Sequence, residues 1–300
     1  MQKNKHAYLI MAHHRLDLLK RLIKALDRPE NDVYIHLDIK CKEKMDFDAK
    51  HCNIIWIDRM NVRWAGYSQV ECELKLIEAA ISANKPYQYL HLMTGASYPL
   101  KSLDYIEDFF DKHDGFEFIG YADNPEKTYD RVKNWFIFNE VGKPVTVWDN
   151  FKIRIRSLYV IAERKLGIDH FLKYNMIYKK GLTYWSITLD CAKYVMQNKK
   201  LIRNMLKHSL YGDEVFIQTI VYNSPYYDKV FNVRNEYKGS LFCAGWKECV
   251  LEDRKGEVEP NLILDDYNFF SDPNYLFGLK FEGSEGMMLI DKIDREILQK

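Results

Sequence analysis

Apolar and polar positions alternate along the first third of the chain in a pattern that predicts strands and helices in turn. Four short apolar runs have the length of strands buried on both faces: Ala7–Ala12, Val33–Leu37, Ile54–Ile57 and Tyr87–Met93. Three segments between or after them place their apolar residues at helical spacing: Leu16–Leu26, Ser68–Ala83 and Leu103–Phe110. This order predicts an α/β fold with a mainly parallel central sheet flanked by helices.

Polar residues directly follow three of the predicted strands. His13 and His14 follow the first, Asp38 follows the second, and Thr94–Ser97 follows the fourth. In parallel α/β sheets, ligands bind beyond the carboxyl ends of the strands. We therefore expect the functional site at this edge of the sheet, built in part from these residues.

The second half of the chain is less regular. Residues 134–180 are basic and aromatic, and we expect an insertion there with a surface helix whose charged face is solvated. Gly181–Leu189 has the pattern of a strand and Cys191–Asn198 that of a helix, and two further helical patches flank the loop Ser209–Glu214. Residues 234–262 are rich in turn formers and are expected to be irregular.

Composition and charge exclude several classes of protein. The 300 residues are 47% hydrophobic and 29% charged, which is ordinary for a folded chain, and the formal net charge is +1. Without a basic excess, nucleic acid is not an expected partner. The apolar run Ala7–Ala12 is far shorter than the roughly 20 residues of a membrane-spanning helix, and no export signal is visible. We expect a soluble, cytoplasmic protein without a transmembrane segment, and peripheral membrane attachment through the basic stretch 152–165 stays open.

Several motifs that mark catalytic or metal sites are missing. The chain has no GxxxxGK[ST] or GxGxxG phosphate loop, no HExxH motif and no GxSxG turn. Its six cysteines form no CxxC pair, so we expect reduced thiols and no structural zinc site. His13 and His14 are adjacent on an extended segment, where neighbouring side chains point to opposite sides, and this disfavours a shared metal. Asp46 and Asp48 lie in a polar loop and are interpreted as surface charges.

Glu214 is the best candidate for acid–base chemistry. It follows Gly212 and Asp213 and begins an apolar helical stretch. A carboxylate in this position is often a helix cap or a partner of the helix dipole. A partly buried glutamate could also serve as the general base that deprotonates a hydroxyl nucleophile. The residues alone leave both roles open.

Seven short segments follow one another across nearly the whole chain. They are Tyr8–His13, Val33–Asp38, Val62–Ser68, Leu92–Ser102, Gly181–Ser186, Gly212–Glu214 with Phe216 and Thr219, and Leu276–Phe281. Each motif is weak alone, but their order is specific. The chain resembles the core-2/I-branching β-1,6-N-acetylglucosaminyltransferase family, which also contains the peptide O-xylosyltransferases, and it looks like a short, soluble, bacterial-type member.

The resemblance implies a fold and a reaction. The expected fold is one GT-A type domain over residues 1–300, with a nucleotide-binding half (1–125) and an acceptor and catalytic half (126–300) that ends in a diphosphate-binding segment. The expected reaction is inverting transfer of N-acetylglucosamine or xylose from a UDP-sugar to a hydroxyl of a glycan or lipid-linked oligosaccharide. No divalent metal or other cofactor is implied, because the best understood members work without one. Two alternatives stay open, a nucleotide-sugar-binding pseudoenzyme and a metal-dependent transferase that uses Asp46 and Asp48.

The resemblance also implies roles for individual residues. Glu214 matches the family's catalytic base, and Lys280 matches a lysine that contacts the UDP diphosphate in place of a metal. The residues expected around the nucleotide are Met11, Ala12, His13, Asp38, Arg63, Trp64, Gly95 and Ser97, the last of which replaces the family's usual aspartate. Arg254 or Lys255 is expected to supply a second diphosphate contact, because Glu257 stands near the place where some members have an arginine. The residues expected to contact the acceptor are Lys127, Arg131, Tyr184 and Trp185.

Overall fold

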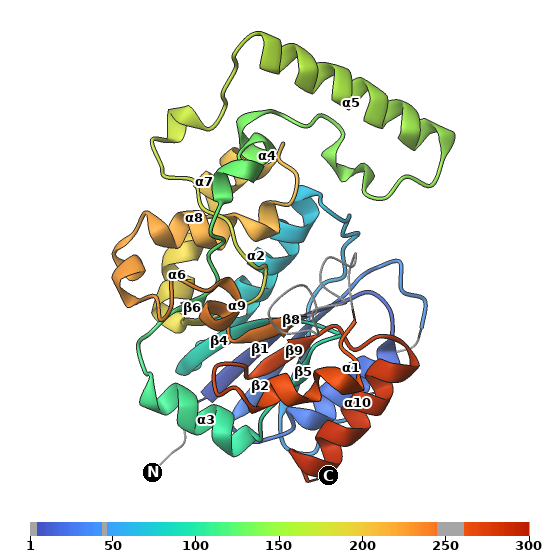
Figure 1. Ribbon diagram of the computed structural model, residues 1–300, viewed down its shortest axis with the longest axis vertical. Helices are drawn as coiled ribbons and strands as arrows, with labels where there is room; N and C mark the ends of the chain where they lie inside the picture. The colour runs from blue at the N-terminus through green and yellow to red at the C-terminus, as the bar shows by residue number, and fades with distance from the viewer. Residues whose placement is uncertain (1–4, 44–46, 245–260, 300) are drawn as a thin grey trace.

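The computed structural model describes residues 5–43, 47–244 and 261–299, which form an α/β fold with two sheets (Figure 1). Within these residues the larger sheet has six strands in the order β3-β2-β1-β4-β7-β6. They are β1 (Lys5–Ala12), β2 (Asn31–Leu37), β3 (Asn53–Trp56), β4 (Tyr87–Thr94), β6 (Phe118–Ile119) and β7 (Trp185–Thr188). The first four run parallel, whereas β7 pairs antiparallel with both β4 and β6. The predicted mainly parallel sheet and its four leading strands are therefore confirmed.

A second sheet joins segments that are far apart in the sequence. Its strands in the described residues are β5 (Tyr98–Pro99), β8 (Phe242–Ala244) and β9 (Phe277–Leu279), with β9 in the middle. The strand β8 and the helix α9 (Glu236–Ser240) both fall inside the segment that was expected to be irregular. That prediction is wrong for residues 236–244, because a three-residue strand is too short to show a period and forms only through its pairing with β9.

Helices cover both faces of the larger sheet. Those that pack on it are α1 (Leu16–Ala25), α2 (Tyr67–Ser82), α3 (Leu103–Lys112), α6 (Leu189–Gln197), α7 (Lys199–Leu206), α8 (Phe216–Tyr222) and α10 (Gly283–Glu296). Two more helices, α4 (Asp130–Lys133) and α5 (Val147–Lys165), lie away from it (Figure 1). The predicted helices after the first, third and fourth strands are confirmed, as is the surface helix in residues 134–180. The expected strand Gly181–Leu189 is shorter: β7 begins at Trp185, and Leu189 already begins α6.

Two hydrophobic cores lie on the two faces of the larger sheet. Tyr8 and Ile10 of β1 point to the core formed with α1, α3, α10 and the small sheet. Ala7 and Leu9 point to the core formed with α2, α6, α7 and α8. Because successive side chains of a strand alternate between faces, a central strand buried on both sides must be apolar throughout. In the described ranges, no helix has both the length and the apolar character needed to cross a bilayer.

Candidate active site

The carboxyl ends of β1, β2 and β4 meet at one edge of the sheet. The backbone N–H of Asp38 donates to the carbonyl of Ala12 at 2.8 Å, and the N–H of Gly95 donates to the carbonyl of Met11 at 2.9 Å. A Cβ at position 95 would lie 3.1 Å from the Cβ of Ala12, so glycine lets the turn after β4 approach β1 closely. The structure thus brings together these four residues that were predicted to surround a nucleotide.

Ser97 has a structural role in the turn after β4. Its side chain is buried, and its Oγ accepts a hydrogen bond from the backbone N–H of Thr94 at 3.1 Å. The N–H of Ser97 in turn donates to the carbonyl of Thr94 at 3.0 Å. These bonds fix the turn beside the expected nucleotide site, and a contact of Ser97 with the nucleotide itself stays a prediction.

Lys280 reaches the same edge from the other end of the chain. It directly follows β9, and the next residue, Phe281, donates its N–H to the carbonyl of Ala96 at 3.2 Å. Burial and the neighbouring His14 ring lower the pKa of His13, and the positive charge of Lys280 acts in the same direction. His13 and Lys280 therefore lie close enough for their charges to interact, and the diphosphate contact of Lys280 stays a prediction.

The rings of His13 and His14 lie against each other, with their centroids 4.0 Å apart. The expectation that they point to opposite sides is wrong, because the backbone bends at both residues and Arg15 has a left-handed φ of 53°. Nε2 of His14 lies 3.1 Å from Oε1 of Glu282. In the described part of the chain, no group of three or more His, Cys, Asp or Glu side chains is placed to hold a metal ion.

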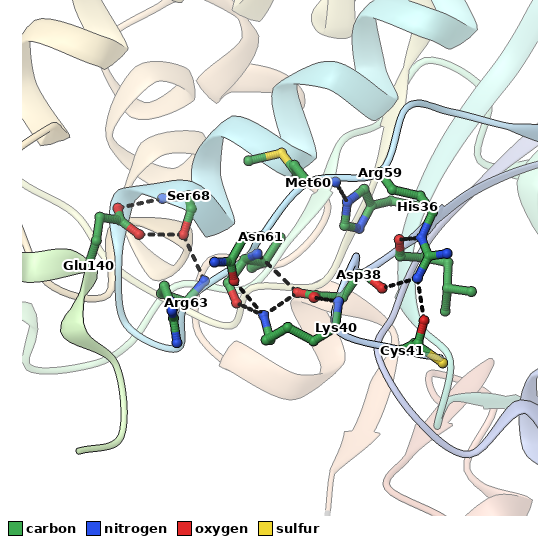
Figure 2. A network of polar contacts seen from close by, with 12 residues as sticks. His36, Asp38, Lys40, Cys41, Arg59, Met60, Asn61, Arg63, Ser68 and Glu140 are labelled. Atoms are coloured by element: carbon green, nitrogen blue, oxygen red, sulfur yellow. Dashed lines mark hydrogen bonds and ion pairs between the residues drawn. The ribbon is translucent and has the colours of Figure 1, made fainter. Parts of the chain in front are cut away.

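Asp38 holds the loop that follows β3 (Figure 2). Its carboxylate accepts hydrogen bonds from the N–H of Lys40 at 2.8 Å, from Nζ of Lys40 at 2.6 Å and from the N–H of Val62 at 2.9 Å. Burial alone would raise the pKa of Asp38, but these hydrogen bonds outweigh burial and lower the pKa below its ordinary value. Asp38 is therefore a buried, ionised anchor at the end of β2.

Arg59 extends the network around Asp38 in Figure 2. Its guanidinium donates to the backbone carbonyls of Leu37 at 3.0 Å and Asp38 at 2.7 Å, and also to the carbonyl of Cys41. Sequence reasoning missed Arg59, because its three acceptors are backbone carbonyls. Every residue has such a carbonyl, so these contacts produce no recognisable sequence motif. The guanidinium fixes the chain as it leaves β2.

A second set of hydrogen bonds holds Arg63 at the start of α2. Its backbone N–H donates to Oγ of Ser68 at 2.8 Å. Ser68 donates from its N–H and its hydroxyl to the carboxylate of Glu140, at 2.9 Å and 2.6 Å (Figure 2). The segment between β3 and α2 is thus pinned near its middle by Asp38 and at its end by Glu140.

Glu214 ends the short 3₁₀ helix η4 (Gly212–Glu214). Its Oε2 lies 2.5 Å from Nη1 of Arg131 and 3.1 Å from Nζ of Lys180. Among the described residues, Oε1 receives no hydrogen bond, and the side chain is 27% exposed. No side-chain cap forms at the start of α8. A carboxylate that is oriented by two cations and keeps one oxygen open suits a general base.

Arg131 is itself held by an aromatic ring. Its guanidinium carbon lies 4.4 Å from the ring centroid of Tyr211, and the exposed Trp64 meets the same ring edge-on at 5.3 Å. The N–H of Tyr211 donates to the carbonyl of Ala65 at 2.9 Å. The loop expected to contact the nucleotide is therefore connected directly to the group around Glu214.

Asp213, which precedes Glu214, is a buried carboxyl group, and its charge acts on a second buried carboxyl group, Glu73. Oδ2 of Asp213 accepts hydrogen bonds from Oγ1 of Thr183 at 3.1 Å and from Nε2 of Gln69 at 3.2 Å, whereas Oδ1 is buried without a partner in the described residues. Burial, with the charge of Glu214 second, raises the pKa of Asp213 to about 7. Glu73 is fully buried on α2, and burial together with the charge of Asp213 raises its pKa far above the ordinary value.

The residues expected to contact an acceptor lie in different surroundings. Lys127 is exposed on the 3₁₀ helix η1 (Pro125–Thr128), and Arg131 faces Glu214 from α4. Tyr184 is partly buried, with its ring 5.2 Å from that of Phe242. Trp185 is completely buried in β7, so the expectation that it contacts an acceptor is wrong. Its side chain points into the core beside α2 and has no face to offer.

Some expected residues fall outside the described ranges. Arg254, Lys255 and Glu257 belong to residues 245–260, and Asp46 belongs to residues 44–46. Their predicted roles stay predictions. Asp48 is described and is exposed, which agrees with its interpretation as a surface charge.

Sequence reasoning missed several residues around Glu214 and its neighbour Asp213. They are Lys180, Tyr211, Gln69, Glu73 and Thr183. A signal was available for Lys180, which immediately precedes the Gly181–Ser186 motif. Glu73 gave none, because a glutamate within an amphipathic helix is normally solvated.

Comparison with known proteins shows the family of the chain. A family model described as "Core-2/I-Branching enzyme" matches residues 6–238, which include Arg131, Lys180 and Glu214. Xylosyltransferase oxt of Drosophila melanogaster is 25% identical over 300 residues, covering 92% of this chain and 31% of the relative.

Two human proteins are also similar. A β-1,3-galactosyl-O-glycosyl-glycoprotein β-1,6-N-acetylglucosaminyltransferase is 28% identical over 102 residues, which cover 32% of this chain and 24% of the relative. An N-acetyllactosaminide β-1,6-N-acetylglucosaminyl-transferase is 22% identical over 199 residues, which cover 64% of this chain and 46% of the relative. The chain thus spans less than half the length of each of these relatives.

Proposed function

This chain belongs to the core-2/I-branching enzyme family, and on that premise we propose that it is an inverting glycosyltransferase that moves a sugar from a UDP-sugar to a hydroxyl of a glycan. The proposed sugar is N-acetylglucosamine or xylose, since the similar proteins are named as transferases of both kinds. The observation that carries the proposal is Glu214. It is oriented by Arg131 and Lys180 through one oxygen, and its other oxygen receives no hydrogen bond from the residues that the structure describes.

In the proposed reaction Glu214 accepts the proton of the acceptor hydroxyl. The hydroxyl oxygen attacks the anomeric carbon of the donor on the side opposite UDP, the bond between that carbon and UDP breaks, and the configuration inverts. Negative charge grows on the departing diphosphate. Lys280, next to His13 at the strand ends, supplies the positive charge that stabilises it.

The proposal also assigns roles to other residues that were expected around the nucleotide. Met11, Ala12, Asp38 and Gly95 form the hydrogen-bonded floor of the nucleotide site. The proposal includes no divalent metal, because lysine supplies the charge that a metal would supply, and Arg254 or Lys255 remains proposed for a second contact. The acceptor is a glycan or a lipid-linked oligosaccharide in this proposal.

Glu214→Gln tests the proposed base. The amide keeps the shape of the side chain but cannot accept the proton, so we expect transfer, or slow hydrolysis of UDP-N-acetylglucosamine or UDP-xylose, to fall by about a hundredfold or more. Calorimetry should show UDP affinity within a few-fold of the wild type. Glu285→Gln, on an exposed position of α10, is the matched control. Turnover that is unchanged in Glu214→Gln would refute the mechanism.

Lys280→Met tests the proposed diphosphate contact. Loss of a charge-assisted hydrogen bond should weaken UDP binding by about tenfold or more, while uridine binding stays the same. Lys20→Met, an exposed lysine on α1, is the control. The titration is run in EDTA and again with Mg²⁺ or Mn²⁺. Equal affinities favour the metal-free proposal, whereas UDP binding that requires the metal would contradict it.

A further inference from the structure

The long helix α5 lies at one edge of the molecule, away from both sheets (Figure 1). Of its 19 residues, Val160 and Glu163 alone are buried. The helix is therefore attached to the protein along a narrow line, and most of its circumference faces solvent. A surface helix of this kind usually turns its apolar stripe toward the core and its polar side outward.

On α5 the apolar stripe faces outward. At 100° per residue, Val147, Phe151, Leu158 and Ile161 fall within one arc of about 80°, opposite the two buried residues. They are 85%, 52%, 67% and 47% exposed, and Trp148 beside them is 72% exposed. These five residues form what we call the outer face of α5. A contiguous exposed apolar surface that includes aromatic side chains marks an interaction site.

The charges on the outer face are basic. Arg154 and Lys165 are exposed within the same arc. The helix carries two carboxylates, and both are engaged elsewhere. Asp149 accepts hydrogen bonds from the backbone at the helix N-terminus, at 2.9 Å and 3.1 Å. Glu163 is buried, with its carboxylate 2.8 Å from the ring of His170. The outer face therefore combines apolar groups with positive charge that no carboxylate of α5 offsets.

We propose that the outer face of α5 binds an anionic lipid surface. The helix would lie in the plane of the bilayer interface, with its apolar side chains among the acyl chains and its basic side chains at the lipid phosphates. Trp148 suits the boundary between headgroups and hydrocarbon. Charge decides against a second copy of the chain as the occupant. A two-fold contact centred on two outer faces would set Arg154 against Arg154 of the other copy, and a parallel contact would also bring the two Lys165 side chains together.

The attachment of α5 places this surface near Glu214. Arg164 forms an ion pair of 2.7 Å with Asp130, the residue before Arg131 on α4. The charge of Arg156 influences the pKa of Tyr211, whose ring holds Arg131. A bilayer at the outer face would thus lie on the acceptor side of the site and would favour an acceptor carried on a lipid. That consequence rests on the proposed function, whereas binding to the bilayer does not.

Co-sedimentation with vesicles tests the proposal on the full chain. The vesicles contain phosphatidylcholine alone or phosphatidylcholine with phosphatidylglycerol, and we expect binding to the anionic vesicles. Arg154→Gln/Lys165→Gln should weaken this binding roughly thirty-fold at low salt. Phe151→Ser/Leu158→Ser should weaken it by about tenfold or more. The matched controls, which should bind as the wild type does, are Lys20→Gln/Lys112→Gln and Ile39→Ser/Met288→Ser, all at exposed positions.

Three outcomes would overturn the proposal. They are a folded wild-type chain that does not bind anionic vesicles, binding that both outer-face variants leave unchanged, and a concentration-dependent dimer that Phe151→Ser/Leu158→Ser dissociates. The last outcome would assign the face to a second copy. Glu214→Gln should bind vesicles as the wild type does, so that a failure of the proposed reaction is distinguished from a failure of lipid binding.

Discussion

Replacing Asp213 with asparagine removes a buried carboxyl group next to Glu214. The asparagine keeps an oxygen for Thr183 and Gln69, and its NH₂ group occupies the place of Oδ1, which has no partner among the described residues. The perturbation therefore changes the charge of the site and leaves its shape almost intact. Its effect on the free energy of unfolding depends on how far burial shifts the titration of Asp213.

Burial raises the pKa of Asp213 from 3.8 to about 7. Because the pKa is higher in the folded state, Asp213 keeps its proton in the folded chain at pH values between about 4 and 7. The unfolded chain has already released this proton in the same pH range. The stability associated with this proton is fully present below about pH 4 and is lost as the pH rises toward 7. A difference of about three in pKa corresponds to about 4 kcal/mol. The asparagine variant has no such proton, so its free energy of unfolding should not show this decrease with rising pH.

Urea unfolding at a series of pH values between 4 and 8 measures the effect. The wild-type free energy of unfolding should fall by about 4 kcal/mol more over this range than that of Asp213→Asn. Any cost of burying the NH₂ group does not depend on pH, so it offsets the curves without changing their slopes. Asp123→Asn, at an exposed position, should follow the wild type. Identical slopes for wild type and Asp213→Asn would show that Asp213 is ionised throughout, and the reasoning would fail.

Two further substitutions test the backbone around the site. Arg59→Lys keeps the charge but loses the planar guanidinium that donates to three backbone carbonyls. Urea unfolding should therefore show that the free energy of unfolding falls by about 2 kcal/mol. An unchanged urea midpoint would contradict this role of Arg59. In Gly181→Ala the new Cβ would overlap the carbonyl oxygen of Gly120, and thermal and urea unfolding should show a loss of about 3 kcal/mol. Gly95→Ala, where the nearest contact is 3.1 Å with a side chain, should cost clearly less.

Much of the fold follows from the sequence because its strands are buried on both faces. Such strands are continuous apolar runs, and β1, β2, β3 and β4 are all visible as runs of this kind. The strand β8 is different. Its three residues form a strand because β9, more than thirty residues later, pairs with them. A periodicity argument cannot detect an element whose partner is distant and whose length is less than two periods.

Some residues of the candidate site could also be predicted from the sequence, and others could not. The strand-end residues Asp38 and Gly95 could be located from the rule that ligands bind at the carboxyl ends of parallel strands. Glu214 stood out as a carboxylate at a helix start, and its role as a base came from the resemblance. Lys180 and Glu73 reach the site through tertiary packing alone, one from the segment before β7 and the other from the buried side of α2.

The segment between β3 and α2 joins the two sides of the site. Asp38 binds the backbone of Val62 near its middle, and the carbonyl of Ala65 accepts from Tyr211 near its end. Tyr211 stacks on Arg131, and Arg131 orients Glu214. One continuous set of contacts therefore runs from the end of β2 to the proposed base. Since Tyr211 also holds a left-handed φ of 55° without being glycine, its position is set by the packing around it rather than by local preference. The sequence offers no local sign of such a residue, and the geometry of the proposed base depends on it.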